Sequence, residues 1–287
     1  MQSQFKHIAE DVRRQVDDLL SGLGILCRVF GRGKDEISLE NKIAKEPGKY
    51  STGGKLVQDT IGIRVALYFP EDIDIVKSIL CSKYEYDEGS STIDSPKNDQ
   101  FAVTRYNLIY KIPPDSTSAF QRISGGRPID CTFEVQLRSI LSEGWHEVEH
   151  DLRYKAKKNW EGQDDLSRAL NGVFATLEIS EWSMSRIFDE LSYRHYKSRN
   201  WTGMLQNKLK MRIHGELSSA LHSIFDKNPA VAKEFSRIDR SKLLKELSKF
   251  RPRLPLTIDN AVYLWNKTYS KNEDISHITP DIINDSR

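Results

Sequence analysis

Two segments of the chain alternate strictly between apolar and other residues, and this pattern constrains the fold more than any other feature. The alternation covers residues 61–69 and residues 131–138. Because successive side chains of a β-strand point to opposite faces of a sheet, each segment predicts a strand with one apolar face. The other face of the second segment carries three long polar side chains: Glu134, Gln136 and Arg138. A polar cleft accounts for such a face, and so does an ordinary solvated sheet surface.

Helical periodicity surrounds these strands, which predicts an α+β region followed by an all-helical one. Apolar residues at helical spacing predict helices near the N-terminus, after the first strand and after residue 140. From residue 163 to residue 250 the pattern is helical throughout, with breaks expected at Gly203 and Pro229, and a last short helix is expected before residue 270. The expected strands are residues 25–30, 61–69, 101–112 and 131–138, and the expected helices of the first region are residues 3–22, 36–45, 71–82 and 141–155.

Three stretches predict little regular structure. Residues 85–100 are polar and are expected to form a strand remnant and a loop. Residues 113–129 are rich in proline, serine and glycine and predict a loop, and the polar tail after Ser270 is expected to be loose. We therefore predict two domains, residues 1–158 and residues 159–287.

Composition excludes several classes of protein. Of the 287 residues 38% are hydrophobic, which is enough for a core and argues against general disorder. No apolar run has the roughly 18 residues that a membrane span needs. The three cysteines are odd in number and far apart, which argues against a disulfide framework and a zinc site. We expect a cytoplasmic protein without a membrane partner.

Charge is distributed unevenly along the chain. Residues 1–190 carry a formal net charge of −6, and residues 191–287 carry +8. A basic region of this kind can attract nucleic acid or an acidic partner. A solvated helical surface has the same composition, so both interpretations remain open.

Charged residues near the predicted strands suggest a site for metal and phosphate. Asp59 precedes one strand, and Glu134 lies on the polar face of another. Carboxylates from two strands can hold magnesium, which prefers oxygen ligands and retains water and phosphate oxygens. Arg32, Lys34 and Lys42 lie beside a strand-to-helix turn, where cations can hold a polyphosphate or simply be solvated.

Four segments together resemble the synthetase domain of the RelA/SpoT family, including its small alarmone synthetases and their toxic relatives. The first is Arg-Gly-Lys at residues 32–34, followed by Ser38 and Lys42, and the second is Asp-Thr-Ile-Gly-Ile-Arg at residues 59–64. The third is Glu-Val-Gln-Leu-Arg at residues 134–138. The fourth spans residues 145–155 and consists of Trp145, Glu149-His150, Leu152 and Tyr154-Lys155. Their order and spacing agree with the predicted strands and helices, over roughly residues 20–156.

The resemblance implies a nucleotidyltransferase-like mixed sheet with flanking helices, and a reaction that moves pyrophosphate from ATP to the 3′-hydroxyl of a nucleotide. Asp59 and Glu134 would then be catalytic and hold Mg²⁺, and Glu134 could help to deprotonate the hydroxyl. The ATP-binding residues would be Arg32, Lys34, Ser38, Lys42 and Arg64. Trp145 is expected in the core, and His150 is expected to be buried and hydrogen-bonded.

The acceptor side departs from the family pattern. Where the family has Gly-Tyr-x-Ser-x-His, this chain has Phe101 in place of the tyrosine and Arg105 in place of the histidine. Phe101 retains a ring that can stack on a base. The expected acceptor-binding residues are Phe101, Arg105, Gln136 and Arg138.

Three functions are compatible with these residues. The first is a pyrophosphokinase that makes a (p)ppGpp- or (p)ppApp-type alarmone in the stringent response, with growth inhibition as a toxin among its possible roles. The second is a toxin that pyrophosphorylates the 3′ end of tRNA, which the basic region favours. The third is a non-catalytic protein that senses nucleotides or binds a partner; joint retention of Asp59, Arg64 and Glu134 argues against it. An antitoxin or regulatory protein is an expected partner, and oligomers are compatible with the sequence.

Overall fold

The computed structural model describes residues 5–45, 48–51, 53–94, 105–250 and 254–284. By its internal contacts the chain divides into two compact units. The first comprises Met1–Asp18 and Cys27–Glu178, and the second comprises Leu19–Leu26 and Ile179–Arg287. A 34-residue helix, α6 (Asp164–Lys197), contributes to both units. Within the described residues, no helix has both the length and the apolar content needed to cross a membrane.

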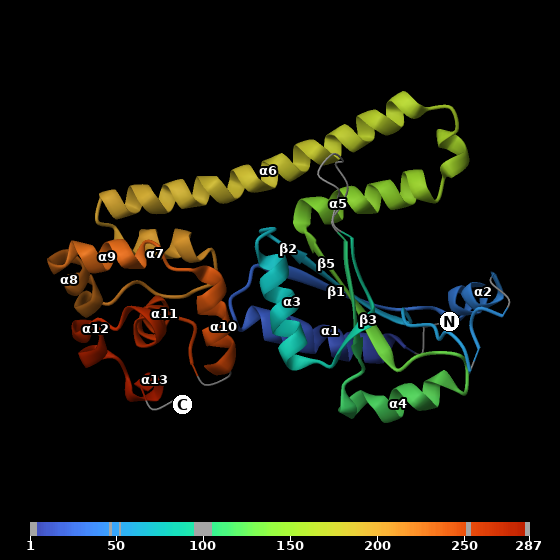
Figure 1. Ribbon diagram of the computed structural model, residues 1–287, viewed down its shortest axis with the longest axis horizontal. Coiled ribbons are helices and arrows are strands. Elements are labelled where there is room, and N and C mark those ends of the chain that lie inside the picture. The colour runs from blue at the N-terminus through green and yellow to red at the C-terminus, as the bar shows by residue number, and fades with distance from the viewer. Residues whose placement is uncertain (1–4, 46–47, 52, 95–104, 251–253, 285–287) are drawn as a thin grey trace. The chain divides into compact units, whose positions relative to one another are not determined.

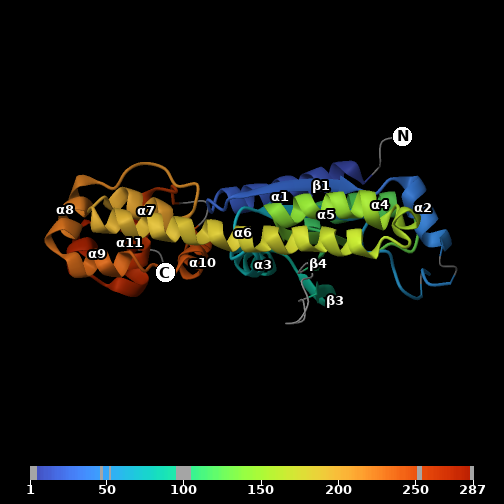
Figure 2. The same cartoon turned by 90° about the horizontal axis from the view of Figure 1, so that it is seen from above.

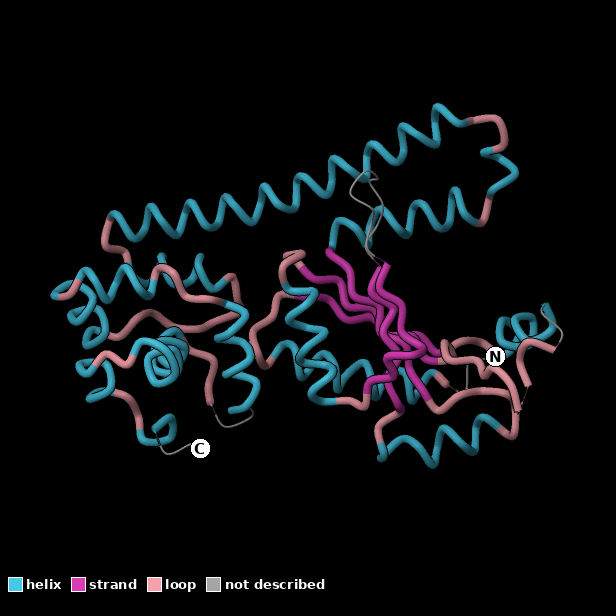
Figure 3. The backbone as a smooth tube through the Cα atoms, viewed as in Figure 1, coloured by secondary structure: helices cyan, strands magenta, loops and turns pink. Residues whose placement is uncertain are grey.

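The first unit is built on one five-stranded mixed sheet with the strand order β1-β2-β5-β4-β3, drawn in magenta in Figure 3. Strands β2 and β5 run parallel at its centre, and the other neighbours are antiparallel. This confirms the predicted α+β class with a mixed sheet. The strands are β1 (Cys27–Gly33), β2 (Ile61–Leu67), β3 (Tyr86–Asp94), β4 (Arg105–Lys111) and β5 (Thr132–Ser139).

One face of the sheet is apolar and forms the core of this unit. Strands β2 and β5 turn Ile63 and Val135 to this face, and the two residues are paired in register and fully buried. Helices α1 (Lys6–Ser21), α3 (Asp72–Lys83) and α4 (Pro114–Ser124) supply the facing side chains. Figure 1 shows α1 and α4 on the same side of the sheet, and the rings of Phe5 and Phe120 pack there with their centroids 5.5 Å apart.

The opposite face carries the polar residues of β2 and β5 and is approached by α5 (Ile140–Glu149), which continues as a π-helical turn over His150–Tyr154. Figures 1 and 2 both show α5 beside the first part of α6. The half-buried ring of Trp145 lies 4.7 Å from the ring of Phe174 on α6, and its indole N–H donates to the carbonyl of Leu170. Trp145 therefore attaches α5 to α6.

The expected loop at residues 113–129 is corrected by the structure, because α4 occupies most of it. Pro114 stands at the first turn, where its fixed φ favours a helix and its missing N–H costs nothing. Gly125 ends the helix in the left-handed conformation, with φ +58°. Proline and glycine here mark the two ends of a helix, and buried Phe120 anchors it to the core.

The strand remnant expected within residues 85–100 is confirmed and is a full strand, whereas the expectation of a loose C-terminal tail is corrected. Residues 86–94 form a nine-residue strand, β3, whose pairing with β4 shifts register between Asp87 and Thr92. Up to Asn284 the tail after Ser270 is ordered, because α12 (Glu273–Ile278) and α13 (Asp281–Asn284) bury Ile275 and Ile283 completely. Two apolar residues in a polar tail are enough to anchor these short helices.

The second unit is all-helical, as predicted. The expected break at Gly203 lies instead at Asn200, whose side chain caps α7 (Trp201–Leu209) by accepting the N–H of Gly203. The expected core positions Leu205, Leu209, Leu217, Leu221 and Phe225 are all buried. The remaining helices are α8 (Ser219–Lys227), α9 (Pro229–Phe235), α10 (Arg240–Phe250) and α11 (Ile258–Trp265).

Candidate active site

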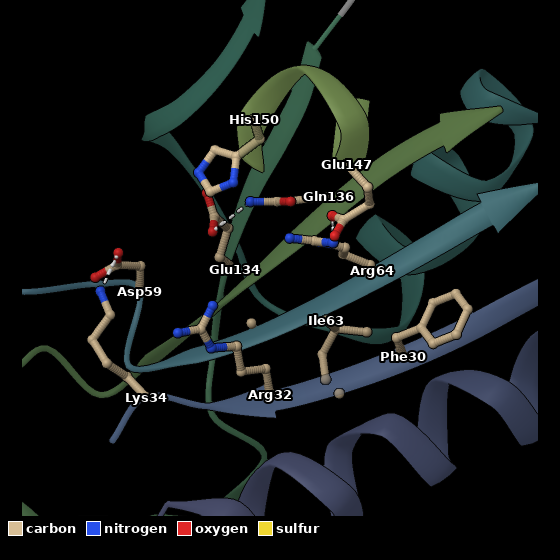
Figure 4. Close-up of a pocket in the computed structure, with 12 residues that line it drawn as sticks. Phe30, Arg32, Lys34, Asp59, Ile63, Arg64, Glu134, Gln136, Glu147 and His150 are labelled. Carbon is tan, nitrogen blue, oxygen red and sulfur yellow. Dashed lines mark hydrogen bonds and ion pairs between the residues drawn. The ribbon is translucent and has the colours of Figure 1, made fainter. Parts of the chain in front are cut away.

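A cavity of about 530 Å³ opens on the polar face of the sheet (Figure 4). Its floor follows the strand register: Gly62 on β2 lies between Arg32 on β1 and Glu134 on β5. Two residues further along β2, Arg64 lies between Phe30 on β1 and Gln136 on β5. Alternation along three paired strands therefore brings these side chains together. The cavity is lined by Phe30, Gly31, Arg32, Lys34, Asp59, Gly62, Ile63, Arg64, Glu134, Gln136, Glu147 and His150.

Two lysines hold one oxygen of Asp59. Lys34, which follows β1, donates from Nζ to Oδ2 of Asp59 at 2.6 Å, and Lys42 on α2 (Glu36–Lys45) donates to the same oxygen at 2.7 Å. Burial acts to raise the pKa of Asp59, but the hydrogen bonds and charges of Lys34 and Lys42 outweigh it and keep the pKa below its ordinary value. Asp59 is therefore ionised at neutral pH.

Glu134 has the opposite electrostatic environment. Burial raises the pKa of this carboxyl, and the negative charge of Asp59 raises it further. Gln136 donates from Nε2 to Oε2 of Glu134 at 3.1 Å and opposes the shift. Two carboxyls in one cavity thus have pKa values displaced in opposite directions, an arrangement that is frequent at functional sites and also occurs in structural ion-pair networks.

These two carboxylates fit a magnesium ion. Oδ1 of Asp59 is buried and accepts no hydrogen bond from the residues that the structure describes, so this oxygen could coordinate a cation. The raised pKa of Glu134 shows that a positive charge beside it would be favourable. The described residues contain no cluster of three or more His, Cys, Asp or Glu side chains suited to a metal. Magnesium, however, is commonly bound by one or two carboxylates together with water and phosphate oxygens.

Arg64 lines the cavity but is already paired with two carboxylates of α5. Its Nη1 donates to Oε1 of Glu143 at 2.9 Å and also to Oε1 of Glu147. Arg138 is buried and lies outside the cavity lining, where its Nη1 donates to the other oxygen of Glu143 at 2.8 Å. Arg138 also donates to Oε1 of Gln136 at 3.3 Å, so it reaches the cavity only through that side chain.

The remaining predicted residues lie elsewhere. Ser38 borders a second, shallower cavity of about 300 Å³ with Asn41, Lys42 and Lys45 along α2. Arg105 begins β4 and pairs with Asp94 in the ladder with β3. Phe101 lies outside the described residues. The roles assigned to these residues stay predictions.

Six lining residues were not among the predicted site residues. Gly31, Gly62 and Ile63 are strand neighbours of predicted residues, whereas Phe30, Glu147 and His150 are additions to the site. His150 was expected to be buried, but 39% of its side chain is exposed; its Nδ1 lies 3.0 Å from Oδ1 of the adjacent Asp151. Glu143, Glu147 and His150 recur at a spacing of four and three, which places them on one face of a helix. This spacing, on the helix face opposite Trp145, is the sequence signal that could have predicted that these residues face the cavity.

The comparisons with known proteins agree with this geometry. The family described as "Region found in RelA / SpoT proteins" matches residues 31–159, which hold all the lining residues except Phe30. GTP pyrophosphokinase YjbM of Bacillus subtilis (strain 168) is 26% identical over 103 residues. That match covers 36% of this chain and 45% of YjbM, so the chain spans less than half the length of this curated relative.

Solved structures of small alarmone synthetases share the fold. Small alarmone synthetase 1 from Bacillus subtilis has a TM-score of 0.50 at 21% identity, over 64% of this chain and 92% of that one. Small alarmone synthetase 2 from the same organism has a TM-score of 0.50 at 20% identity, over 64% and 95%. Another structure of synthetase 1, bound to its product pppGpp, has a TM-score of 0.50 at 20% identity, over 66% and 94%. The family match confirms the resemblance of this region to RelA/SpoT proteins, and the solved structures show that it shares the fold of small alarmone synthetases. The relation to the toxic relatives stays a prediction.

Proposed function

We propose that the RelA/SpoT synthetase domain formed by residues 31–159 of this chain is a pyrophosphokinase that uses ATP as donor and a purine nucleotide as acceptor. The observation that carries the proposal is the pairing of Lys34 and Lys42 with Asp59 beside Glu134, in a cavity that Arg32 and Arg64 also line. The family match and the names of its relatives support the same reaction.

The donor half of the site binds phosphate by charge. Lys34 and Lys42 contact Asp59, and Arg32 lines the same cavity. Phosphoryl transfer depends mainly on positioning and charge stabilisation. When bound between Asp59 and Glu134, Mg²⁺ would neutralise charge that develops on the transferred group. Lys34 and Lys42, which bind the other oxygen of Asp59, would supply N–H donors to the phosphate oxygens of ATP.

We assign Glu134 as the base that accepts the proton of the acceptor 3′-hydroxyl. In the transfer, the acceptor 3′-oxygen forms a bond to the β-phosphorus of ATP, the bond between that phosphorus and the α–β bridging oxygen breaks, and AMP leaves. The hydroxyl proton passes to a base, and a carboxylate with a raised pKa accepts a proton more readily than an ordinary one. A base in this position typically contributes about 10²–10⁴-fold to the rate.

The acceptor is proposed to be a guanine or adenine nucleotide, bound with help from Gln136. One solved relative of the same fold is bound to pppGpp, which supports a guanine nucleotide. The 3′-terminal adenosine of tRNA is the second candidate. Lys242, Lys245 and Lys249 are exposed at a spacing of three and four on α10, in the region with a net charge of +8. Such a face can hold tRNA phosphates.

One experiment tests the activity and the acceptor together. The purified chain is mixed with Mg²⁺ and ATP labelled at the β and γ phosphates, and GDP, GTP, AMP, ADP, ATP and deacylated tRNA are offered separately. Label on a guanine or adenine nucleotide supports the primary proposal, and label on tRNA alone supports the second. If the wild-type chain labels none of them, and label recovery equals that of Glu134→Gln, the proposal is rejected in favour of a non-catalytic protein.

A growth-inhibiting role and a neutralising protein partner are separate proposals that depend on this activity. Unbalanced synthesis would consume ATP, and transfer to tRNA would block aminoacylation of its 3′ end. Induced expression of the wild-type chain should then slow growth, whereas Glu134→Gln at the same protein level should not. Equal growth of the two strains would reject the toxic role without affecting the enzymatic one.

A further inference from the structure

Four charged side chains form a connected cluster beside the cavity, and two of them, Arg64 and Glu147, line it. Arg64 donates to Glu143 at 2.9 Å and to Glu147, and Arg138 donates to the second oxygen of Glu143 at 2.8 Å. Two guanidinium groups and two carboxylates have no formal net charge. Arg64 therefore does not offer an uncompensated positive charge to a phosphate in this arrangement, although it lines the cavity.

The two carboxylates differ in how firmly they are held. The side chain of Glu143 is 12% exposed and that of its partner Arg138 is 6% exposed. Moving Glu143 away would leave a buried guanidinium unpaired, which is strongly unfavourable. The side chain of Glu147 is 48% exposed and can exchange its contact with Arg64 for water at little cost. In Figure 4 the Glu147 carboxylate lies against the Arg64 guanidinium within the view of the cavity.

We propose that Glu143 is a fixed positioning residue for Arg64 and that Glu147 is a displaceable counter-charge, whose place on Arg64 is taken by an anionic group of the incoming nucleotide. This inference rests on the proposed donor function. A phosphate oxygen accepts the same N–H that Glu147 accepts, so the exchange preserves the hydrogen bond of Arg64. Glu143 remains in place throughout, because Arg138 holds its other oxygen.

The proposal predicts opposite signs for two substitutions that remove the same charge. Electrostatics alone would make both Glu143→Gln and Glu147→Gln tighten nucleotide binding, because each removes a negative charge near a polyanion. We expect Glu147→Gln to tighten binding of a non-hydrolysable ATP analogue by about threefold, since it removes a competitor for Arg64. We expect Glu143→Gln to weaken it by about tenfold, since the guanidinium loses its anchor.

The measurement is titration calorimetry of the full chain with the Mg²⁺ complex of the analogue. Glu149→Gln is the matched control: Glu149 is on the same helix, pairs with Arg153 at 3.2 Å and lies outside the cavity lining, so its affinity should equal that of the wild type. Glu143→Asp keeps the charge and shortens the reach. Glu143→Asp should also weaken binding of the analogue. If Glu143→Gln does not fold, Glu143→Asp shows whether a change at Glu143 weakens or tightens binding.

The role of Arg64 is tested in a double-mutant cycle. In an Arg64→Ala background, Glu143→Gln and Glu147→Gln should each change the affinity by less than twofold, because both act through Arg64. Full effects in that background would overturn the inference, as would a shift in the same direction for both single variants. A wild-type chain that does not bind the analogue would instead reject the proposed donor site itself.

Discussion

The ammonium group of Lys34 lies 2.6 Å from Oδ2 of Asp59, although the two residues are 25 positions apart in the chain. Lys42 adds a second ammonium group to the same oxygen at 2.7 Å. The two lysines that we propose for phosphate binding are thus both paired with one carboxylate oxygen. Both ammonium groups bind Oδ2, which leaves Oδ1 of Asp59 as the oxygen that would hold Mg²⁺ under the proposed function.

Asp59→Asn is expected to reduce kcat/KM for pyrophosphate transfer by at least about 100-fold, a typical loss for one electrostatic contact to developing charge. Because the pKa of Asp59 is lowered in the folded chain, its carboxylate stabilises the fold at neutral pH, and asparagine should also lower the thermal unfolding midpoint. Rates are therefore compared at a temperature well below the midpoint of the variant. Initial rates with labelled ATP measure the effect. Asp115→Asn, an exposed acid in the first turn of α4, is the control and should retain wild-type rates. Normal turnover by Asp59→Asn would remove this residue from the site.

The raised pKa of Glu134 predicts a stability effect with a defined sign. Burial, and next the charge of Asp59, raise this pKa in the folded chain. The folded state therefore binds more protons than the unfolded state between the ordinary pKa and the raised one, so the unfolding free energy falls as pH rises through that window. Glutamine does not ionise, so Glu134→Gln should abolish this decrease in unfolding free energy with rising pH.

Urea unfolding in a chelating buffer checks the effect. The variant should match the wild type below pH 4 and be more stable than it at pH 8, while transfer falls by about 100-fold or more. A constant difference in unfolding free energy across this pH range would contradict the assignment of the shift to Glu134.

Sequence reasoning predicted the central part of the site because strand alternation is a local property. The period of two in residues 61–69 and 131–138 assigned Arg64, Glu134 and Gln136 to one sheet face, where the structure has them. It did not predict that Arg138, on the same strand face, is buried against Glu143. That contact depends on how α5 folds back over β5, which no pattern within either element specifies.

The missed elements have a common physical cause. In α4 and the tail helices, a few buried side chains such as Phe120 and Ile283 attach the helix to the core. The surrounding residues are polar, proline or glycine, so the local composition predicts a loop. His150 and Glu147 were not predicted as site residues because helical spacing shows which residues share a face, but it does not show which part of the protein that face contacts.

Metal binding should stabilise the first unit through Asp59 and Glu134. A ligand that binds only the folded state adds about 1.4 kcal/mol to the unfolding free energy at ten times its dissociation constant. Titration of Mg²⁺ in the absence of nucleotide should therefore raise the thermal midpoint of the wild type. Asp59→Asn and Glu134→Gln should not respond. Equal responses in all three proteins would indicate that magnesium binds elsewhere.

Gly125 tests whether the end of α4 depends on a left-handed residue. Its φ is +58°, and an added Cβ would meet only the carbonyl oxygen of Ile123 at 3.8 Å, so backbone strain is the main cost of a side chain. Gly125→Ala should lower the unfolding free energy by about 1 kcal/mol. Gly126→Ala, with φ +75° and open space, should cost about as much, whereas Gly144→Ala inside α5 should not destabilise the chain. Transfer rates of all three variants should match the wild type.

Salt dependence distinguishes the two proposed acceptors. Binding to tRNA releases counterions, and its affinity should fall with salt by about 0.7–0.9 in log–log slope for each phosphate contact. Replacing Lys242, Lys245 and Lys249 by glutamine should then reduce that slope by about 2 and raise KM for tRNA, while KM for GTP or ATP as acceptor stays unchanged. Their exposure makes folding defects small. If the triple variant changes neither tRNA transfer nor its slope, the lysines of α10 do not contact the acceptor. A free nucleotide acceptor should show the same KM in both proteins at every salt concentration.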